Sequence, residues 1–174
     1  MVRVGFFGGC FNPPTNIHIN LANNLIKEGK LDKVVFVPVN DYYKKEDLIE
    51  ANHRYNMLKL ATKDYDNLDV DDIEIKENRK LFAVDAFELI CNTKLTNKKE
   101  IFFIMGSDNF NKMSSWKDYE KIKDKYRYIV IERDGNEVSS TQTRDIIRNN
   151  NEEAKKYLDD EVYKYIIEND LYKL

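Results

Sequence analysis

The sequence predicts an α/β fold: a Rossmann-like, doubly wound parallel sheet with helices on both faces and a C-terminal helical segment. Three observations predict it. Short apolar runs alternate with helix-like segments up to residue 131, two of these runs end at glycines, and the chain from residue 140 onward has helical patterns alone. A strand, a crossing helix and a second parallel strand form the unit from which such sheets are built.

The chain opens with one such unit. Val2–Phe7 is a short apolar run that ends at Gly8 and Gly9, which predicts a buried strand breaking into a turn. Thr15–Glu28 has apolar residues at helical spacing and is followed by a glycine, a common helix end. Lys33–Val39 is a second apolar run of strand length. The carboxyl end of the first strand should therefore face a helix N-terminus.

The later strands and helices are predicted from alternation and helical spacing. Strands are expected at Leu68–Ile75, Glu100–Met105 and Tyr128–Ile131. Helices are expected at Ala51–Thr62, Leu81–Asn92, Thr141–Asn150 and Asp160–Asn169. In open sheets of this kind, ligands bind outside the carboxyl ends of the strands.

Bulk properties set the class of protein and of ligand. The 174 residues, 42% hydrophobic and 34% charged, fit one domain spanning 1–174. A net charge of −3 gives no general attraction to nucleic acid, which favours a small phosphorylated ligand at a locally built site. Cys10 and Cys91 lack metal or disulfide spacing, so we expect reduced thiols. No run is apolar enough to span a membrane and the apolar start is too short for a signal peptide, so we expect the cytoplasm.

Two features near the N-terminus could serve phosphate binding. Gly8 and Gly9, between strand and helix, would let a phosphate approach the backbone, although an ordinary turn would also explain them. His18 lies three residues after Thr15, so both side chains project near the first turn of the predicted helix. A lone histidine in a helix is more often a packing residue. Separately, neither feature identifies a function.

Together they match a known signature. Gly-Gly-Cys-Phe-Asn-Pro-Pro-Thr-Asn-Ile-His, from Gly8 to His18, resembles the first motif of the nucleotidyltransferase superfamily. The resemblance implies that His18 contacts the phosphates of ATP, with Thr15, Phe11 and the two glycines beside the same nucleotide. Ile17 stands where most of the superfamily has glycine. With the Asn-Pro and Thr-Asn pairs, this bulky residue resembles the eukaryote-like nicotinamide mononucleotide adenylyltransferases.

A second motif follows the second predicted strand. Pro38–Leu48 contains Tyr-Lys-Lys and resembles a stretch of the nicotinate/nicotinamide mononucleotide adenylyltransferase family. Without that context a lysine pair is ordinarily surface charge. The resemblance implies that Lys45, or failing it Lys44, binds the phosphates. A His-Arg pair further on, His53 and Arg54, is expected to support helix and loop.

A third motif begins where the predicted strand Glu100–Met105 ends. Gly106 and Asp108, followed by Trp116, resemble the family's glycine-x-aspartate segment and its later tryptophan. The resemblance implies that Gly106 and Asp108 bind ATP, Asp108 through the ribose, and that Trp116 stacks on the pyridine ring. A single tryptophan belongs to the core of a protein about as often as to a ligand site.

The fourth motif opens the C-terminal helical segment. Val138–Arg144 has serine and threonine at a helix start, where they are natural N-cap residues, and resembles the family's Ser-Ser-Thr-x-x-Arg motif. The ATP-binding residues implied are Ser139, Ser140, Thr141 and Arg144. Cys10 and Arg133 are expected beside the pyridine nucleotide. The least supported region is Lys76–Asp85, because this chain has Leu81–Ala86 where many bacterial relatives have a threonine-rich stretch, and substrate contacts there stay open.

The resemblance implies an adenylyltransferase that joins ATP and nicotinate or nicotinamide mononucleotide, releasing pyrophosphate. His18, Lys45 and Arg144 would be the catalytic residues, helped by Mg²⁺ held mainly by phosphate oxygens and water. The expected partners are these two nucleotides, without nucleic acid or membrane. Two alternatives stay open: a sister transferase that uses phosphopantetheine or CTP, and an inactive nucleotide-binding domain. The sequence leaves open acid or amide preference, homo-oligomer formation and the role of Ile17.

Overall fold

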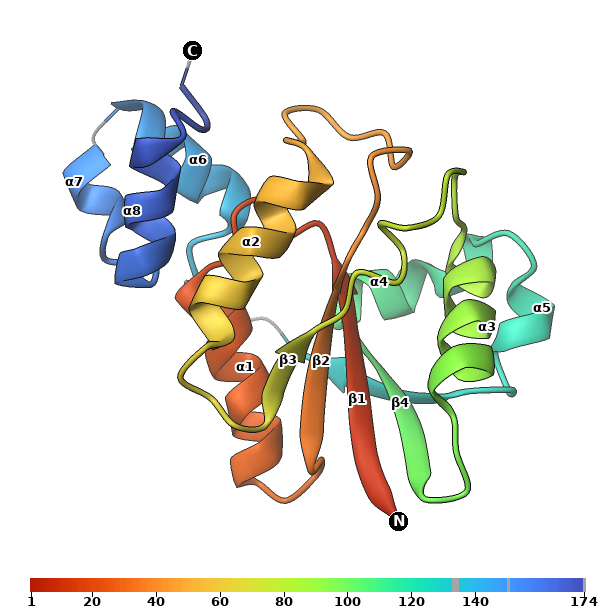
Figure 1. The fold of residues 1–174 in the computed structure, drawn as a ribbon. Coiled ribbons are helices and arrows are strands. Elements are labelled where there is room, and N and C mark those ends of the chain that lie inside the picture. Colours follow the sequence, from red (N-terminus) through yellow and green to blue (C-terminus); the bar gives the residue numbers. More distant parts are fainter. Residues whose placement is uncertain (133–134, 150, 174) are drawn as a thin grey trace.

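A five-stranded parallel sheet forms the centre of the computed structural model, which describes residues 1–132, 135–149 and 151–173 (Figure 1). The strands are β1 (Val2–Gly9), β2 (Lys33–Pro38), β3 (Leu68–Val70), β4 (Lys99–Gly106) and β5 (Arg127–Ile131). Their order is β3-β2-β1-β4-β5, and every pairing is parallel. The predicted doubly wound parallel sheet is confirmed.

Helices cover both faces of this sheet (Figure 1). They are α1 (Asn16–Lys27), α2 (Ala51–Thr62), α3 (Ala83–Lys94), α4 (Ser107–Lys112), α5 (Tyr119–Ile122), α6 (Ser140–Asn149), α7 (Asn151–Ala154) and α8 (Asp160–Glu168), with a 3-10 turn η1 (Met113–Ser115). The first two helices and the C-terminal three lie on one side, and α3 to α5 lie on the other. Among the described residues, every helix is too short or too polar to cross a membrane.

Alternate residues of each central strand point to opposite faces and build two cores. Phe7 and Phe36 belong to the larger core under α1, α2 and the C-terminal helices. Phe6 and Val35 belong to the core under α3. Strands covered on both faces must be apolar at consecutive positions, which explains why β2 is a continuous apolar run.

The central strand β1 determines where a ligand site can form in this sheet. The chain passes from β1 to β2 on one side and later returns to β4 on the other, so the direction of winding reverses between β1 and β4. A crevice forms at such a point outside the carboxyl ends of the strands. Side chains pack closely on the middle of β1: a Cβ on Gly5 would lie 2.4 Å from Leu31 Cδ1 and 2.6 Å from Ile104 Cδ1, so this position has no room for a larger residue.

The third strand is shorter than predicted, ending at Val70 and not at Ile75. On the neighbouring strand the last residue paired with β3 is Phe36, and two positions further on is Pro38, which has no N–H to continue the ladder. The carboxylate of Asp71 instead accepts a hydrogen bond from the backbone N–H of Ile73 at 3.0 Å and turns the chain. The alternation after Val70 therefore belongs to a turn.

Other boundaries differ by a few residues. Gly8 and Gly9 continue β1, so the turn predicted to start at Gly8 begins two residues later. The helix α3 begins at Ala83 and not at Leu81, because the carboxylate of Asp85 accepts the N–H of Phe82 at 2.8 Å. The short elements α4, η1, α5 and α7 were not predicted. The last residue of the helix predicted at 141–150 lies outside the described residues.

Candidate active site

The turn after β1 is shaped by a buried phenylalanine. Phe11 has a left-handed backbone (φ 48°), and its ring packs edge-on against Phe7 and Phe36 in the core. A Cβ on Gly9 would lie 3.0 Å from the Phe11 ring, whereas a Cβ on Gly8 would meet nothing within 4 Å. Gly9 is therefore needed for the turn, and the exposed backbone at Gly8 is open to a ligand. Phe11, which was expected beside the nucleotide, has its side chain buried in the larger core.

His18 closes the N-terminus of α1. Its Nδ1 accepts the backbone N–H of Thr15 at 3.0 Å and lies 3.0 Å from the Thr15 hydroxyl. Since Nδ1 is an acceptor there, the neutral ring carries its proton on Nε2. The ring also packs edge-on against Phe11, with 5.2 Å between the centroids. The contacts with Thr15 and Phe11 orient the ring. Thr15 is buried as the N-cap residue.

Arg144 reaches back from α6 to the same turn. Its Nη1 donates to the carbonyl oxygen of Asn12 at 2.8 Å, and its Nη2 donates to the Thr141 hydroxyl at 3.4 Å. The residue is only 5% exposed, and its buried Nε has no hydrogen-bond partner in the described structure. A buried guanidinium N–H without an acceptor indicates a place where an anion can bind.

The start of α6 uses its hydroxyl groups for structure. Ser139 donates its N–H to the side chain of Gln142 at 2.8 Å and accepts the N–H of Gln142 at 3.2 Å, a reciprocal capping box. Ser140 donates its hydroxyl to the carbonyl oxygen of Pro13 at 2.9 Å. The predicted N-cap is confirmed, and the first turn of α6 lies against the turn that follows β1.

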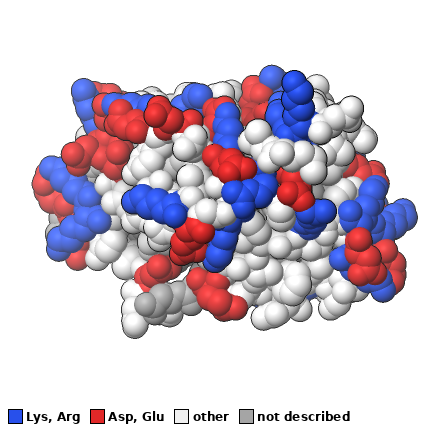
Figure 2. Space-filling view, turned by 90° about the horizontal axis from the view of Figure 1, so that it is seen from below, with Lys and Arg blue, Asp and Glu red and all other residues white. Residues whose placement is uncertain are grey.

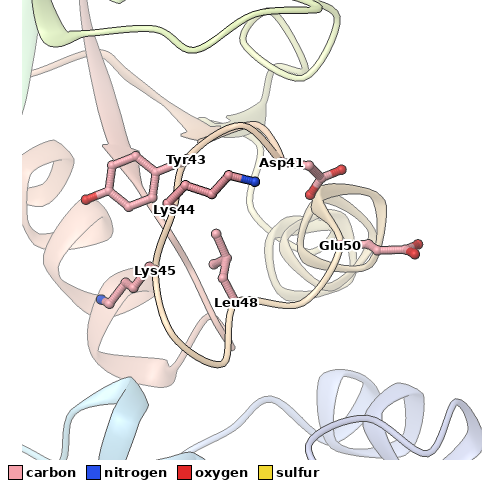
Figure 3. Close-up of a pocket in the computed structure, with 6 residues that line it drawn as sticks. All are labelled: Asp41, Tyr43, Lys44, Lys45, Leu48 and Glu50. Carbon is pink, nitrogen blue, oxygen red and sulfur yellow. The ribbon is translucent and has the colours of Figure 1, made fainter.

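The predicted lysine pair lies in the exposed loop between β2 and α2, residues 39–50, which we call the lysine loop. This loop surrounds a pocket of about 290 Å³ (Figure 3), which is lined by Asp41, Tyr43, Lys44, Lys45, Leu48 and Glu50. The two lysine side chains point in opposite directions, Lys44 toward Asp41 and Lys45 toward the side on which Tyr43 lies. Only one of them can therefore face a given phosphate.

Cys10 shows which cations converge on the turn after β1. Burial raises the pKa of the Cys10 thiol, while the positive charges of Lys45, Arg54 and Arg144 lower it. Lys45 is the residue of the lysine pair whose charge is among the main influences on this thiol. The lysine loop and α6, far apart in sequence, thus bring their charges to the same place.

Arg54 is a structural residue, as the sequence predicted. It is completely buried, and its guanidinium donates to three carbonyl oxygens at 2.8–3.0 Å, those of Cys10, Val39 and Ile49. It fastens the turn after β1 to both ends of the lysine loop. His53, beside it, lies 2.9 Å from the hydroxyl of Tyr165 and connects α2 to α8.

Glu74 is a residue that sequence reasoning missed. It is 8% exposed, and burial raises the pKa of its carboxyl to about 7 although Arg54 lowers it. Its charge also raises the pKa of Cys10, so the carboxyl lies near the turn after β1. Asn40 donates to the Glu74 carbonyl oxygen at 3.2 Å and holds this segment in place. No local signal in the sequence distinguishes Glu74 from its acidic neighbours.

Aromatic and basic side chains lie together at the start of α3 and between η1 and α5. Trp116 is partly buried against a small core formed by Val84, Met105, Met113 and Ile122. Beside it, the Nζ of Lys117 lies 4.5 Å and the Nζ of Lys80 5.0 Å from the ring centroid of Phe82, which is 37% exposed. Neither ammonium group forms an ion pair with a described residue. Asp108 is exposed in the first turn of α4, immediately beyond Gly106, and Arg133 lies outside the described residues.

The positive charges of Lys45, Arg54 and Arg144 act on Cys10 in the turn after β1. On the side where the strands begin, basic and acidic side chains are interspersed (Figure 2). In the residues that the structure covers, no group of three or more His, Cys, Asp or Glu side chains could hold a metal ion. The chemistry that this arrangement supports is the binding and neutralisation of phosphates.

Comparison with known proteins identifies the family. The family model described as Cytidylyltransferase-like matches residues 6–164. A curated protein of Acholeplasma laidlawii, named probable nicotinate-nucleotide adenylyltransferase, is 31% identical over 189 residues, which cover 96% of this chain and 96% of that protein. The chain belongs to the nicotinate-nucleotide adenylyltransferase family. The resemblance drawn from the four motifs is confirmed, as is the nucleotidyltransferase class.

Other proteins with this family's name are similar to the chain over nearly its full length. The Bacillus subtilis enzyme of that name is 29% identical over 99% of this chain and 100% of its own. A solved structure of Plasmodium falciparum nicotinic acid mononucleotide adenylyltransferase complexed with NaAD has a TM-score of 0.77 at 18% identity and covers 99% of this chain and 98% of that one. The structure of the same enzyme complexed with APC has a TM-score of 0.76 at 19% identity and also covers 99% of this chain and 98% of that one. The shared architecture supports the doubly wound fold.

Proposed function

We propose that the chain transfers AMP from ATP to nicotinate mononucleotide, forming the dinucleotide and pyrophosphate. The observation that carries the proposal is the buried Arg144, whose Nε has no acceptor, on the turn that also holds His18 and faces Lys45. The names of the family members support the choice of nucleotides. Three cationic or N–H donor groups at one strand end suit a triphosphate.

The proposed reaction needs no covalent intermediate. A phosphate oxygen of the mononucleotide attacks the α-phosphorus of ATP, and the bond from that phosphorus to the bridging oxygen breaks, so that pyrophosphate leaves with the electron pair. In this reaction His18 donates its Nε2–H to the phosphates. The Nε–H of Arg144 donates a hydrogen bond to the phosphate oxygens. Lys45 neutralises charge that shifts toward the leaving group. Positioning and neutralisation of this kind dominate phosphoryl-type transfer.

Divalent metal enters this proposal with the substrate. The described residues offer no carboxylate cage, so the ion fits as part of the ATP complex, held by phosphate oxygens and water. When bound, Mg²⁺ offsets negative charge on the phosphates. The protein itself contributes His18, Lys45 and Arg144 around them.

The aromatic and basic side chains around Phe82 and Trp116 support nicotinate over nicotinamide mononucleotide. In the proposal Trp116 stacks on the pyridine ring, beside the ammonium groups of Lys117 and Lys80 near Phe82. The acid has one more negative charge than the amide, so cations without an acidic partner favour it. Asp108, in the first turn of α4, binds the ATP ribose.

The test is pyrophosphate release from ATP and Mg²⁺ with each mononucleotide in turn. We expect turnover with both and a kcat/KM that is at least about tenfold higher for the acid, which corresponds to about 1.4 kcal/mol. Binding of ATP without pyrophosphate release would instead identify an inactive nucleotide-binding domain and refute the proposed reaction.

A further inference from the structure

We propose that Asn12 and Tyr172 form a positioning pair that fixes the lysine loop against Arg144. Asn12 is 3% exposed and joins three segments of the chain. Its side-chain N–H donates to the carbonyl oxygen of Asp47 at 2.8 Å, and its own carbonyl oxygen accepts from Arg144 at 2.8 Å. Its Oδ1 accepts from the hydroxyl of Tyr172 at 2.9 Å. The C-terminal segment thereby reaches the first motif.

These contacts define which way the Asn12 amide points. The carbonyl oxygen of Asp47 can only accept, so it takes the amide N–H. The backbone N–H of Ile49 can only donate and lies 3.4 Å from Oδ1, a long contact. The Tyr172 hydroxyl supplies the short hydrogen bond to Oδ1 and is itself 6% exposed. Removal of this hydroxyl would leave a buried amide oxygen with one weak donor.

The lysine loop depends on this amide because its backbone is unusual. Asp47, two residues after Lys45, has a φ of 58°, which is a costly conformation for a residue other than glycine. Asn12 holds its carbonyl oxygen, while Arg148 holds its carboxylate at 3.1 Å and donates to the carbonyl oxygen of Tyr172 at 3.2 Å. Two bridges therefore link Asp47 to the C-terminal segment, one through Asn12 and one through Arg148.

Neither residue of the pair is placed to touch substrate. Asn12 lies in the turn after β1, both residues are buried, and the Tyr172 hydroxyl acts through the Asn12 amide on the loop that carries Lys45. An aspartate at position 12 would lose the amide N–H that donates to the Asp47 carbonyl oxygen. It would also place a carboxylate oxygen against that carbonyl oxygen. The choice of asparagine thus goes with this loop conformation.

Tyr172→Phe tests the pair because it removes one oxygen atom and leaves the ring. Tyr165→Phe is the matched control, since the Tyr165 hydroxyl contacts His53 at 2.9 Å and Asn56 at 3.1 Å on α2 and does not contact the lysine loop. We expect native-state trypsin to cleave after Lys44 or Lys45 at least about fivefold faster in Tyr172→Phe, with no change in the control. Equal cleavage rates in the wild type and Tyr172→Phe would overturn the proposal.

A second experiment measures turnover and rests on the proposed function. Tyr172→Phe should lower kcat about tenfold with little change in the KM for the mononucleotide, because the pair positions Lys45 and binds no substrate. In a Lys45→Ala background, the same substitution should have no further effect on kcat. Independent, multiplying losses would refute the coupling. If the wild type shows no turnover, the proposed function fails, while the trypsin measurement still decides on the pair.

Discussion

His18 combines two tasks in one ring, which is the main difficulty in interpreting its mutation. Nδ1 accepts the Thr15 N–H at the start of α1, and Nε2 is the donor that the proposed mechanism uses. His18→Ala should lower kcat at least about 100-fold, or about 2.7 kcal/mol, and should also destabilise the protein by about 1 kcal/mol through the lost cap.

His18→Gln separates the two tasks. Glutamine at the third helical position completes a capping box with Thr15 and should restore stability, but it does not reproduce the imidazole donor. We expect the glutamine variant to unfold in urea like the wild type and to remain as inactive as the alanine variant. An active glutamine variant would remove the imidazole from the mechanism.

Glu74 makes stability depend on pH. Its pKa is about 7 in the folded protein and 4.5 ordinarily, so the folded state retains the proton to higher pH. This contribution is fully present below pH 4.5 and is lost as pH rises through 7, at a cost of up to about 3 kcal/mol. Glu74→Gln mimics the protonated form, and its melting temperature should exceed that of the wild type at pH 8 but not at pH 4.

The matched control for this experiment is Glu137→Gln, at an exposed position. It should change the melting temperature little at either pH, since an exposed carboxylate has the same environment in both states. If the melting temperatures of the wild type and Glu74→Gln differ by the same amount from pH 4 to pH 8, the pH dependence does not come from the Glu74 carboxyl.

Lys117 should determine the preference for the acid. Its ammonium group lies over Phe82 beside Trp116 without an acidic partner in the described residues. Lys117→Gln should lower kcat/KM for nicotinate mononucleotide about tenfold, or about 1.4 kcal/mol, and should leave the value for the amide nearly unchanged. The control is Lys121→Gln, whose ammonium group is already paired with Asp118 at 3.1 Å. Equal losses for the two mononucleotides would refute a role in selection.

At the scale of elements, the long and regular segments were predictable and the short ones were not. The helix α2 was predicted with the boundaries that the structure shows, because its residues repeat an apolar face over three turns. In contrast, α4 has six residues and α5 has four, too few for a period to emerge. The end of β3 depended on Pro38, which belongs to a neighbouring strand and is invisible in the local pattern.

The capping box of α6 gives a prediction at this scale. Gln142 is exposed and accepts the Ser139 N–H at 2.8 Å, so Gln142→Ala should cost about 0.5–1 kcal/mol of stability. The helix stays packed through Ile147 and keeps Arg144 in place, so kcat should change less than about twofold. Urea unfolding and pyrophosphate release measure the two effects. A large loss of kcat with stability intact would show that the cap itself shapes the site.

For the whole molecule, the sequence predicted the sheet and the edge at which the site lies. It did so because parallel strands with two buried faces leave continuous apolar runs, and because their carboxyl ends meet at one edge. It could not predict which motif residues turn inward. Phe11 is in the core and the hydroxyls of Ser139 and Ser140 serve the turn, because these assignments depend on contacts between segments far apart in the chain.

Metal removal tests how the whole molecule uses a divalent ion. The described residues hold no metal cluster, so EDTA should leave the melting temperature of the ligand-free protein unchanged. ATP with Mg²⁺ at about 100 times its dissociation constant should add about 2.7 kcal/mol of stability, or roughly 5–10 °C for a chain of this size. EDTA should abolish turnover and most of that ligand-induced shift. A chelator that lowers the melting temperature without ATP would reveal a resident metal and contradict the view that the ion arrives on the substrate.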